Sequence, residues 1–518
     1  MARENKASPP NRCNLTDEKW ALIAGKGLVS LRQIFTDTGL RSLGGDPVQK
    51  VAVLKLLLAV SQAAYTPADT AEWEKLGAKG LAKKVLEYLK THYDDFWLYG
   101  KKPFLQIPAI AAAEKQPFGA VMPDIATGNT TVLTQTQRER DITDAEKALL
   151  VVRLMGFALG GKKTDNSVVL SRGYQEKCND KGKPSTGKPG ASIGFLGYLH
   201  SFLTGTSLVE TLWLNLLTRE DIENLKIFTD KATHGLGPVP WETPPAGERD
   251  AVAERLKKSL MGRLVPFSRF VLLAEDGIHY SEGVLHPNHK DGIADPSMAI
   301  NKTEKEYKVF WADPSRRPWR NLTSLLGFLR TGEQYFECPY IRLGIDRIIG
   351  AAKKPPVIGI WSAGLRVSSN AGEQYVSGTD DYVESETFFE SSVFGENLYV
   401  NLKSEMNTLD ELSRVLYGRV AGYYRGLKVE GESFAKQASE LYWQLCERRF
   451  QELVNACDSK EKKPAAELRP YFLRCVQKSY EAFCSRGTAR QLEAWAENYP
   501  NLGKYAAADK EPAEAVNL

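Results

Sequence analysis

The sequence is poor in the residues that build disulfide frameworks and zinc ribbons. Its 518 residues include seven cysteines, an odd number, and no two of them form a Cys-x-x-Cys pair. Small secreted domains and zinc ribbons depend on paired, closely spaced cysteines. The cysteine pattern therefore argues against both classes and favours a reduced compartment.

Sequence signals for catalysis are also scarce. No Gly-x-x-x-x-Gly-Lys-Ser/Thr loop is present to cradle phosphates, so ATP use is not predicted. His286 and His289 stand three residues apart, a spacing that invites a metal or nuclease interpretation. No acidic or cysteine partners surround them at a recognisable spacing. The sequence therefore predicts a recognition protein with no catalytic residue, no metal and no cofactor.

The chain lacks both a strong charge imbalance and a long apolar run. Lysine and arginine number 68 against 64 aspartate and glutamate, a net charge of +4, so any contact with DNA must come from local patches. The N-terminal residues contain no apolar core of a secretory signal. No uninterrupted apolar stretch approaches the roughly 18 residues that cross a membrane. These features predict a cytoplasmic globular protein.

The stretch 118–163 has the clearest internal organisation. Thr143 followed three residues later by Glu146 forms a capping box, which predicts a helix start. Residues 149–157 are apolar on nearly every face, as in a helix that is packed on all sides. The glycine pair that follows allows a left-handed or closely approached backbone. We expect a rigid helix between a Gln/Arg-rich loop and a Gly-Gly-Lys-Lys turn.

Six segments follow one another in an order that is typical of one family: CNLTDEKWALI (13–23), GLVSLRQIF (27–35), LGGDPVQKVAVLKLLLAVSQAAY (43–65), KKPFLQIP (101–108), GNTTVLTQTQ (128–137) and GFALGGKK (156–163). The first resembles the family's opening strand, and the next two resemble its first helical segment. KKPFLQIP resembles its Pro-Phe-Leu/Met-Gln motif. The family is CasA, the large subunit of the type I-E Cascade, an RNA-guided CRISPR surveillance complex. The resemblance covers most of the chain.

This resemblance implies roles for the two loops around the predicted helix. In the family, the first loop contacts the 5′ end of the guide RNA and the backbone subunits; its matching residues here are Asn129, Thr130, Thr131, Val132, Leu133 and Gln135. The family's glycine loop approaches the PAM, the short DNA motif beside the target. Its counterparts here are Gly160, Gly161, Lys162 and Lys163.

A second long polar loop spans residues 366–381. Residues 364–366 match the start of the family pattern Gly-Tyr-Arg-x-Asn-Gln-Ala, whose amide inserts as a wedge beside the PAM. Ser369 and Asn370 stand in its place with one residue inserted, and Gln374 is the other wedge candidate. An amide carries both donor and acceptor, so either side chain suits the minor groove. An ordinary linker between domains is the alternative.

Two further basic segments are candidates for phosphate contact. Residues 172–194 form a Gly/Pro/Ser-rich loop that carries Lys181, Lys183 and Lys188. Arg448 and Arg449 belong to a basic cluster in the C-terminal part. Neutralised phosphates release counterions and raise affinity without reading sequence. A solvated surface is an equally good interpretation of both segments.

Periodicity predicts the remaining elements. Helices are expected after Asp46-Pro47, over 81–98 and over 195–218, and an extended segment between Pro103 and Pro108. Residues 264–285 predict a hairpin that turns at Asp276-Gly277. The family carries a DNA-contacting lysine at the tip of a hairpin in this region, whereas Glu275, Asp276 and Gly277 stand here. Residues 353–365 predict a short strand.

The fold class is predicted to be α+β, a large mixed N-terminal domain followed by a C-terminal four-helix bundle. We expect disordered tails at 1–12 and 506–518, a mixed PAM-recognition domain over 13–380 and the bundle over 385–505. Four apolar stripes carry the bundle prediction, and they begin at Leu409, Phe434, Leu468 and Leu492.

The resemblance implies a non-catalytic large subunit that recognises the PAM in double-stranded DNA. It would promote local unwinding and R-loop formation, and it would recruit the helicase–nuclease effector. The implied partners are the backbone, small and guide-end subunits, the CRISPR RNA and the target duplex, with no membrane. Two alternatives stay open: a metal-dependent nuclease that uses His286 and His289, and a purely structural scaffold subunit.

Overall fold

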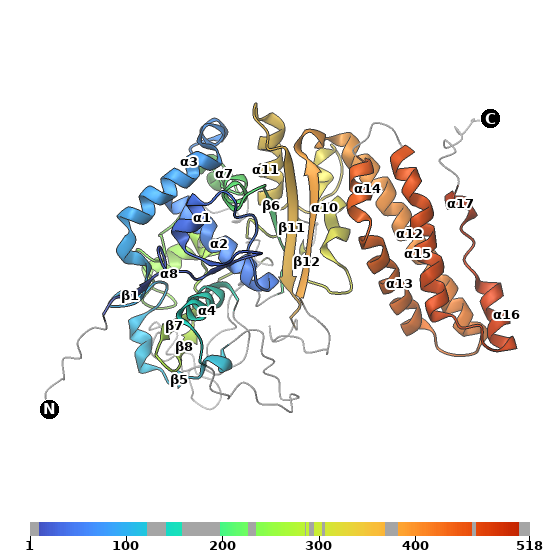
Figure 1. The fold of residues 1–518 in the computed structure, drawn as a ribbon, viewed down its shortest axis with the longest axis horizontal. Helices are drawn as coiled ribbons and strands as arrows, with labels where there is room; N and C mark the ends of the chain where they lie inside the picture. Colours follow the sequence, from blue (N-terminus) through green and yellow to red (C-terminus); the bar gives the residue numbers. More distant parts are fainter. Residues whose placement is uncertain are drawn as a thin grey trace. The chain divides into compact units, whose positions relative to one another are not determined.

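A computed structural model describes residues 10–121, 141–157, 197–225, 235–284, 286–287, 289, 295–302, 306–367, 382–457 and 463–506. The chain divides into two compact units. Unit 1 comprises residues 1–321 and 335–386, and unit 2 comprises residues 322–334 and 387–518. Unit 1 mixes helices with short sheets, whereas the named elements of unit 2 are helices apart from the end of one strand (Figure 1). The predicted α+β fold class is confirmed.

Unit 1 begins with short antiparallel strands rather than with one opening strand. β1 (Arg12–Asn14) pairs with β4 (Trp97–Tyr99), and β2 (Ala21–Ile23) pairs with β3 (Gly27–Val29). The segment 13–23 therefore contains the end of β1 and the whole of β2, with a turn between them. The next segment, 27–35, is a strand that leads into α1 (Leu31–Thr36), which begins at a capping box formed by Ser30 and Gln33.

Helix α2 (Pro47–Ala64) is the central helix of unit 1. Asp46 caps it as predicted, because its side chain accepts a hydrogen bond from the Gln49 backbone and Pro47 occupies the first turn. Thirteen of its residues are buried. By length and composition α2 could cross a membrane, but 72% of the relevant window is buried inside the protein. Its hydropathy is that of a core helix.

Helix α3 (Thr70–Thr91) packs against α2 and α6 (Leu208–Leu214). Trp73 and Trp213 stack with centroids 4.1 Å apart, and each indole donates to the other's backbone carbonyl at 2.9 and 3.0 Å. The helix predicted over 81–98 ends at Thr91. A 3-10 turn (Tyr93–Phe96) and β4 follow, since residues 97–99 pair with β1.

The expectation of one helix over 195–218 is wrong. Residues His200–Thr204 form strand β6, and α6 begins only after Ser207, whose side chain caps it. Four of the five β6 residues are buried. A strand buried on both faces has no alternating pattern, so its apolar run resembles a helix.

The sheets of unit 1 are small. β6, β11 (Val357–Leu365) and β12 (Tyr382–Glu390) form a sheet in the order β12-β11-β6, in which β6 and β11 are antiparallel. β5 (Lys115–Gln116), β8 (Ile278–Glu282) and β7 (Arg269–Leu273) form a second, and β9 (Ile300–Lys302) pairs with β10 (Tyr307–Val309). The predicted hairpin and the predicted strand before residue 365 are confirmed. The other α-helices in the described part of unit 1 are α4 (Asp144–Gly156), α7 (Arg219–Asn224), α8 (Ala251–Leu256), α9 (Met261–Leu264) and α11 (Pro339–Gly350).

Unit 2 contains α10 (Leu322–Leu326), α12 (Glu396–Gly426), α13 (Glu432–Glu447), α14 (Phe450–Cys457), α15 (Lys463–Phe483), α16 (Ala489–Asn498) and α17 (Gly503–Ala506). The long helices α12, α13 and α15 pack along one another (Figure 1).

Two of the four predicted stripes in unit 2 are shifted. Phe434 is 39% exposed and stacks on Tyr424, while Ala435 and Tyr442 face the core. Leu492 is 49% exposed, and Ala494 is the buried residue of α16. The stack of Phe434 on Tyr424 explains the shift in α13, because an aromatic ring at the surface satisfies an apolar pattern without entering the core.

Candidate nucleic-acid interface

Most of the predicted contacts lie outside the described residues. The stretches 122–140, 158–196 and 368–381 contain Asn129, Thr130, Thr131, Val132, Leu133, Gln135, Gly160, Gly161, Lys162, Lys163, Lys181, Lys183, Lys188, Ser369, Asn370 and Gln374. The structure does describe the residues from which each stretch departs and to which it returns. These anchor residues are the described ends of the three stretches on unit 1.

Helix α4 joins the first two stretches. Its predicted capping box is confirmed: the Thr143 backbone donates to Glu146 at 2.8 Å, and the Glu146 backbone donates to the Thr143 hydroxyl at 3.3 Å. Ten residues of α4 are buried, and Arg153 forms an ion pair with Asp46 at 3.3 Å. The helix packs on α2 and β7. It therefore holds the end of one stretch and the start of the next on the core.

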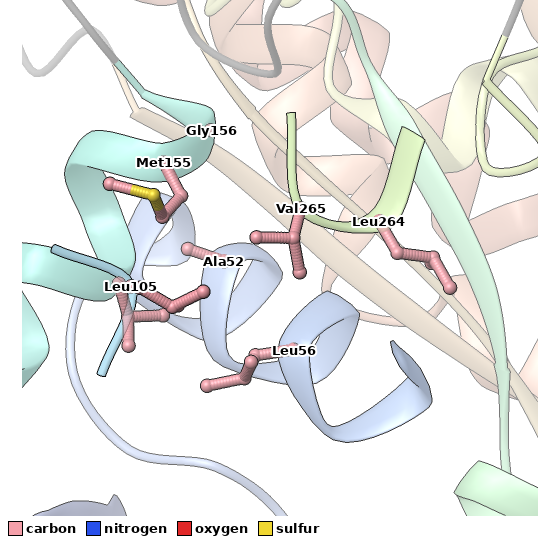
Figure 2. Close-up of a pocket in the computed structure, with 8 residues that line it drawn as sticks. Ala52, Leu56, Leu105, Met155, Gly156, Leu264 and Val265 are labelled. Atoms are coloured by element: carbon pink, nitrogen blue, oxygen red, sulfur yellow. The ribbon is translucent and has the colours of Figure 1, made fainter. Parts of the chain in front are cut away.

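A small apolar cavity lies beneath the C-terminal end of α4. Leu56 of α2, Leu105, and Met155 and Gly156 of α4 line it together with Val265 (Figure 2). Its water-accessible volume is about 10 Å³, at the lower limit for one water molecule. The cavity is too small for a ligand, and its mainly apolar walls offer few polar partners. It belongs to the packing beneath the end of α4, the helix that precedes residue 158.

The second and third stretches are anchored side by side. Residues 158–196 end at Gly197, and residues 368–381 begin after Val367. A Cβ atom on Gly197 would meet a methyl of Val367 at 2.9 Å and the Leu365 carbonyl oxygen at 3.2 Å. Gly197 has φ +67°, which favours glycine. The close approach follows from the antiparallel pairing of β6 with β11, which places Ala363 opposite His200. Two candidate DNA-contacting stretches thus share one anchor point.

A buried ionic cluster fixes the strand that follows this anchor point. Lys55 of α2 is fully buried and forms an ion pair with Asp295. The other Asp295 oxygen accepts hydrogen bonds from the Ser297 backbone at 3.0 Å and hydroxyl at 2.6 Å, and that hydroxyl lies 2.7 Å from Nδ1 of His200 on β6. Burial alone would raise the pKa of Asp295, but the Lys55 and His200 charges hold it below its usual value.

The tip of the β7–β8 hairpin receives lysines from outside the hairpin. Lys115 of β5 donates to Asp276 at 2.6 Å, and Lys147 of α4 donates to the Glu275 carbonyl oxygen at 2.9 Å. The sequence of the tip contains no lysine, so the hairpin sequence alone does not predict either cation. One sequence feature indicated that Lys147 lies near packed structure: it stands next to the apolar run of a predicted buried helix.

His286 and His289 do not form a site with each other. His286 is buried, and its Nε2 donates to the Pro266 carbonyl oxygen at 2.6 Å. Burial, helped by the Arg263 charge, lowers the pKa of His286 to about 3, so the ring is neutral. Nδ1 of His289 lies 2.8 Å from the Tyr198 hydroxyl. Within the described ranges, no three His, Cys, Asp or Glu side chains gather to hold a metal.

The predicted basic cluster of unit 2 is partly committed to internal contacts. Arg449 donates to Glu452 through Nε at 2.8 Å, and its guanidinium lies 5.1 Å from the ring centroid of Tyr471. The hydrogen bond to Glu452 raises the pKa of Arg449. Arg448 is exposed. Of the two phosphate contacts predicted in unit 2, Arg448 is therefore the better placed for an external anion.

The geometry defines a class of protein: an α+β scaffold that fixes the anchors of three long polar segments on one packed unit. The profile of the family described as CRISPR-associated protein Cse1 matches residues 14–480. A curated relative, the CRISPR-associated protein CasA/Cse1 of Thermus thermophilus, is 27% identical over 306 residues, which span 54% of this chain and 52% of the relative. The chain belongs to the Cse1 family.

Two solved structures share the fold. Cse1 of Thermobifida fusca has a TM-score of 0.70 at 20% identity, with 95% of this chain and 97% of that chain covered. A chain in a structure described as a CRISPR RNA-guided surveillance complex has a TM-score of 0.64 at 16% identity, with 94% and 99% covered. At these identities the likeness concerns the fold.

Proposed function

We propose that this chain is the large subunit of an RNA-guided Cascade complex, that it recognises the PAM in double-stranded DNA and that it starts strand separation there. Family membership and the fold shared with a chain of a surveillance complex support the first part. The single observation that carries the second part is the shared anchor point of residues 158–196 and 368–381. Segments that depart from one point can act on the same few base pairs.

The roles of the two segments follow from their chemistry. Gly160 and Gly161 let the backbone approach DNA closely, and Lys162 and Lys163 neutralise phosphates without reading sequence. Asn370 or Gln374 offers a donor and an acceptor to the minor groove, where the guanine amino group separates G·C from A·T pairs. An inserted side chain unstacks a base step at a cost of a few kcal/mol, which the surrounding contacts offset.

Opening only the first base steps is sufficient work for this subunit. Pairing between guide RNA and DNA replaces the DNA pairing that it breaks at nearly equal free energy, with about 1.4 kcal/mol of stacking per step. The remaining barrier is the nucleation of the opening. A rigid scaffold lowers that barrier because its anchors are already ordered by α4 and by the β6–β11 pairing.

The other partners belong to the same proposal. Residues 129–135 would contact the guide RNA's 5′ end and the backbone subunits. The small and guide-end subunits would be further partners of the chain. An outer surface of the chain would recruit the helicase–nuclease effector, and the complex would work in the cytoplasm. The chain would take no part in the chemistry of cleavage. The geometry of His286 and His289, each bonded to a different partner, does not favour the nuclease alternative.

Duplex binding by the guide-loaded complex tests this proposal. Targets should differ only in the three base pairs beside the target, and binding should be measured with and without the chain. We expect the chain to add a dependence on the flank, and the variant Asn370→Ala plus Gln374→Ala to lose it. Equal affinity for all flanks in the presence of the intact chain would refute recognition of the PAM and favour the scaffold alternative.

A further inference from the structure

Trp311 is an exposed tryptophan that rests on a buried aromatic support. Its side chain is 47% exposed, whereas Tyr198 beneath it is 2% exposed. The two rings stack with centroids 5.1 Å apart and an interplanar angle of 27°. The ring of His289 meets Trp311 edge-on at 5.5 Å and 81°. One face of the indole is therefore covered, and its exposed fraction belongs to the other face and the edges.

The polar atoms of this support bind one another. The Tyr198 hydroxyl lies 2.8 Å from Nδ1 of His289, and both residues are buried. The hydrogen bond fixes the ring of Tyr198, and Tyr198 in turn fixes the plane of Trp311. A platform of this kind loses little side-chain entropy when a flat ligand stacks on it, because its rotamer is already set.

Backbone hydrogen bonds hold Trp311 in register with residues 197–199, which directly precede β6. Leu199 donates to the Phe310 carbonyl at 3.0 Å, and Ala312 donates to the Gly197 carbonyl at 2.8 Å. Trp311 itself forms a bridge with Tyr198. The platform thus stands directly beside Gly197, the anchor point of the two segments proposed to act on the PAM.

An arginine, Arg316, follows Trp311 five residues further along the chain. A turn after Trp311, closed by the Arg316 backbone donating to the Asp313 carbonyl at 3.0 Å, presents the exposed Arg316. Arg316 donates through Nε to Asn321 at 3.0 Å. The remaining N–H groups of this guanidinium suit a phosphate, which it can bind with two parallel hydrogen bonds.

We propose that Trp311 is a stacking platform for one unpaired base of the DNA strand that is displaced beside the PAM, with Arg316 at the adjoining phosphate. Proteins bind single strands without reading sequence by combining aromatic faces with cations, and here Arg316 follows the platform five residues further along the chain. The choice of DNA over guide RNA rests on the proposed function of the neighbouring segments. The segment proposed to contact the guide is anchored elsewhere, between Val121 and Asp141.

A single exposed apolar residue is common on protein surfaces and by itself indicates nothing. Tyr417 on α12 is such a residue: it is 40% exposed, and none of the described aromatic residues stacks on it. Trp311 differs because two buried aromatic rings and a strand register hold it. Tyr417→Ala is therefore the matched control for removal of an exposed aromatic ring.

The test uses the guide-loaded complex containing the full chain. The target duplex is opened beforehand by mismatches beside the PAM, and 2-aminopurine replaces successive bases of the displaced strand. Stacking on an indole quenches this fluorophore. We expect quenching at one position, lost in Trp311→Ala and kept in Trp311→Phe and Tyr417→Ala. Affinity for the opened target should fall about five- to 150-fold in Trp311→Ala, the range that one base–aromatic stack supplies.

Because the target is already open, the result does not depend on whether the chain reads the PAM. Unchanged quenching and affinity in Trp311→Ala would overturn the proposal. Weaker association of Trp311→Ala with the guide-loaded complex in the absence of DNA, with no change in quenching, would assign the base to the guide RNA and also overturn it. Equal losses in Trp311→Phe and Trp311→Ala, with a lowered melting temperature in both, would show that the ring is structural.

Discussion

Gln106→Met is the substitution whose effect the structure specifies most fully. Gln106 is 2% exposed, and its amide joins two strands. Nε2 donates to the Leu98 carbonyl of β4 at 2.7 Å, and Oε1 accepts from the Leu273 backbone of β7 at 2.8 Å. Methionine keeps the side-chain volume, so little cavity forms. Two buried backbone groups lose their partners, at about 1–3 kcal/mol each.

We expect Gln106→Met to lower the free energy of unfolding of this region by about 3 kcal/mol, a factor of about 150 in its opening equilibrium. Hydrogen–deuterium exchange measures the change locally, because peptides that cover Leu273 should exchange faster while those of unit 2 should not. Gln116→Met is the control, since the Gln116 side chain on β5 of the same sheet has no hydrogen bond to the described part of the chain. Unchanged protection at Leu273 would refute the assigned role of the amide.

Three further predictions concern the core that holds the anchors. Lys55→Met should destabilise unit 1 by about 3 kcal/mol, because it leaves the buried Asp295 carboxylate without its cation. In urea unfolding, Lys55→Met combined with Asp295→Asn should recover most of that loss. Equal losses in the single and the double variant would contradict a coupled pair. Leu56→Ala should cost about 2–5 kcal/mol, since it enlarges the cavity under α4; a thermal shift within error would argue against tight packing there. The free energy of unfolding should fall as the pH drops from 6.5 towards 3, because in this range the unfolded chain protonates His286 and the folded chain does not. The expected loss is about 2 kcal/mol between pH 6.5 and 5. In unfolding curves, His286→Gln should flatten this pH dependence.

Local signals predicted local structure. The capping box of Thr143 and Glu146, the Asp46-Pro47 start of α2 and the turn at Asp276-Gly277 all involve residues within a few positions of each other. Such signals depend on backbone groups that the same short segment satisfies. The sequence therefore predicted where α4 begins and where the hairpin turns.

Long-range pairing could not be predicted from one sequence. The apolar run 195–218 concealed β6, because its strand partner β11 lies about 160 residues further along the chain. Lys55 finds Asp295 at a separation of 240 residues, and Gln106 finds Leu273 at 167. The shared anchor at Gly197 and Val367 depends on the same β6–β11 pairing. The resemblance to CasA predicted the roles of the segments, and the fold supplies the reason why the anchors of two of them are neighbours.

A thermodynamic cycle between residues 158–196 and 368–381, whose anchors are adjacent, tests the central claim most directly. Binding of the guide-loaded complex to duplexes with the preferred flank should be measured for Lys162→Ala, for Asn370→Ala plus Gln374→Ala, and for the combined variant. If both segments act on the same base pairs, the combined loss differs from the sum of the separate losses by about 0.5 kcal/mol or more. Losses that add within about 0.3 kcal/mol would show that the segments act at separate places and would contradict the account.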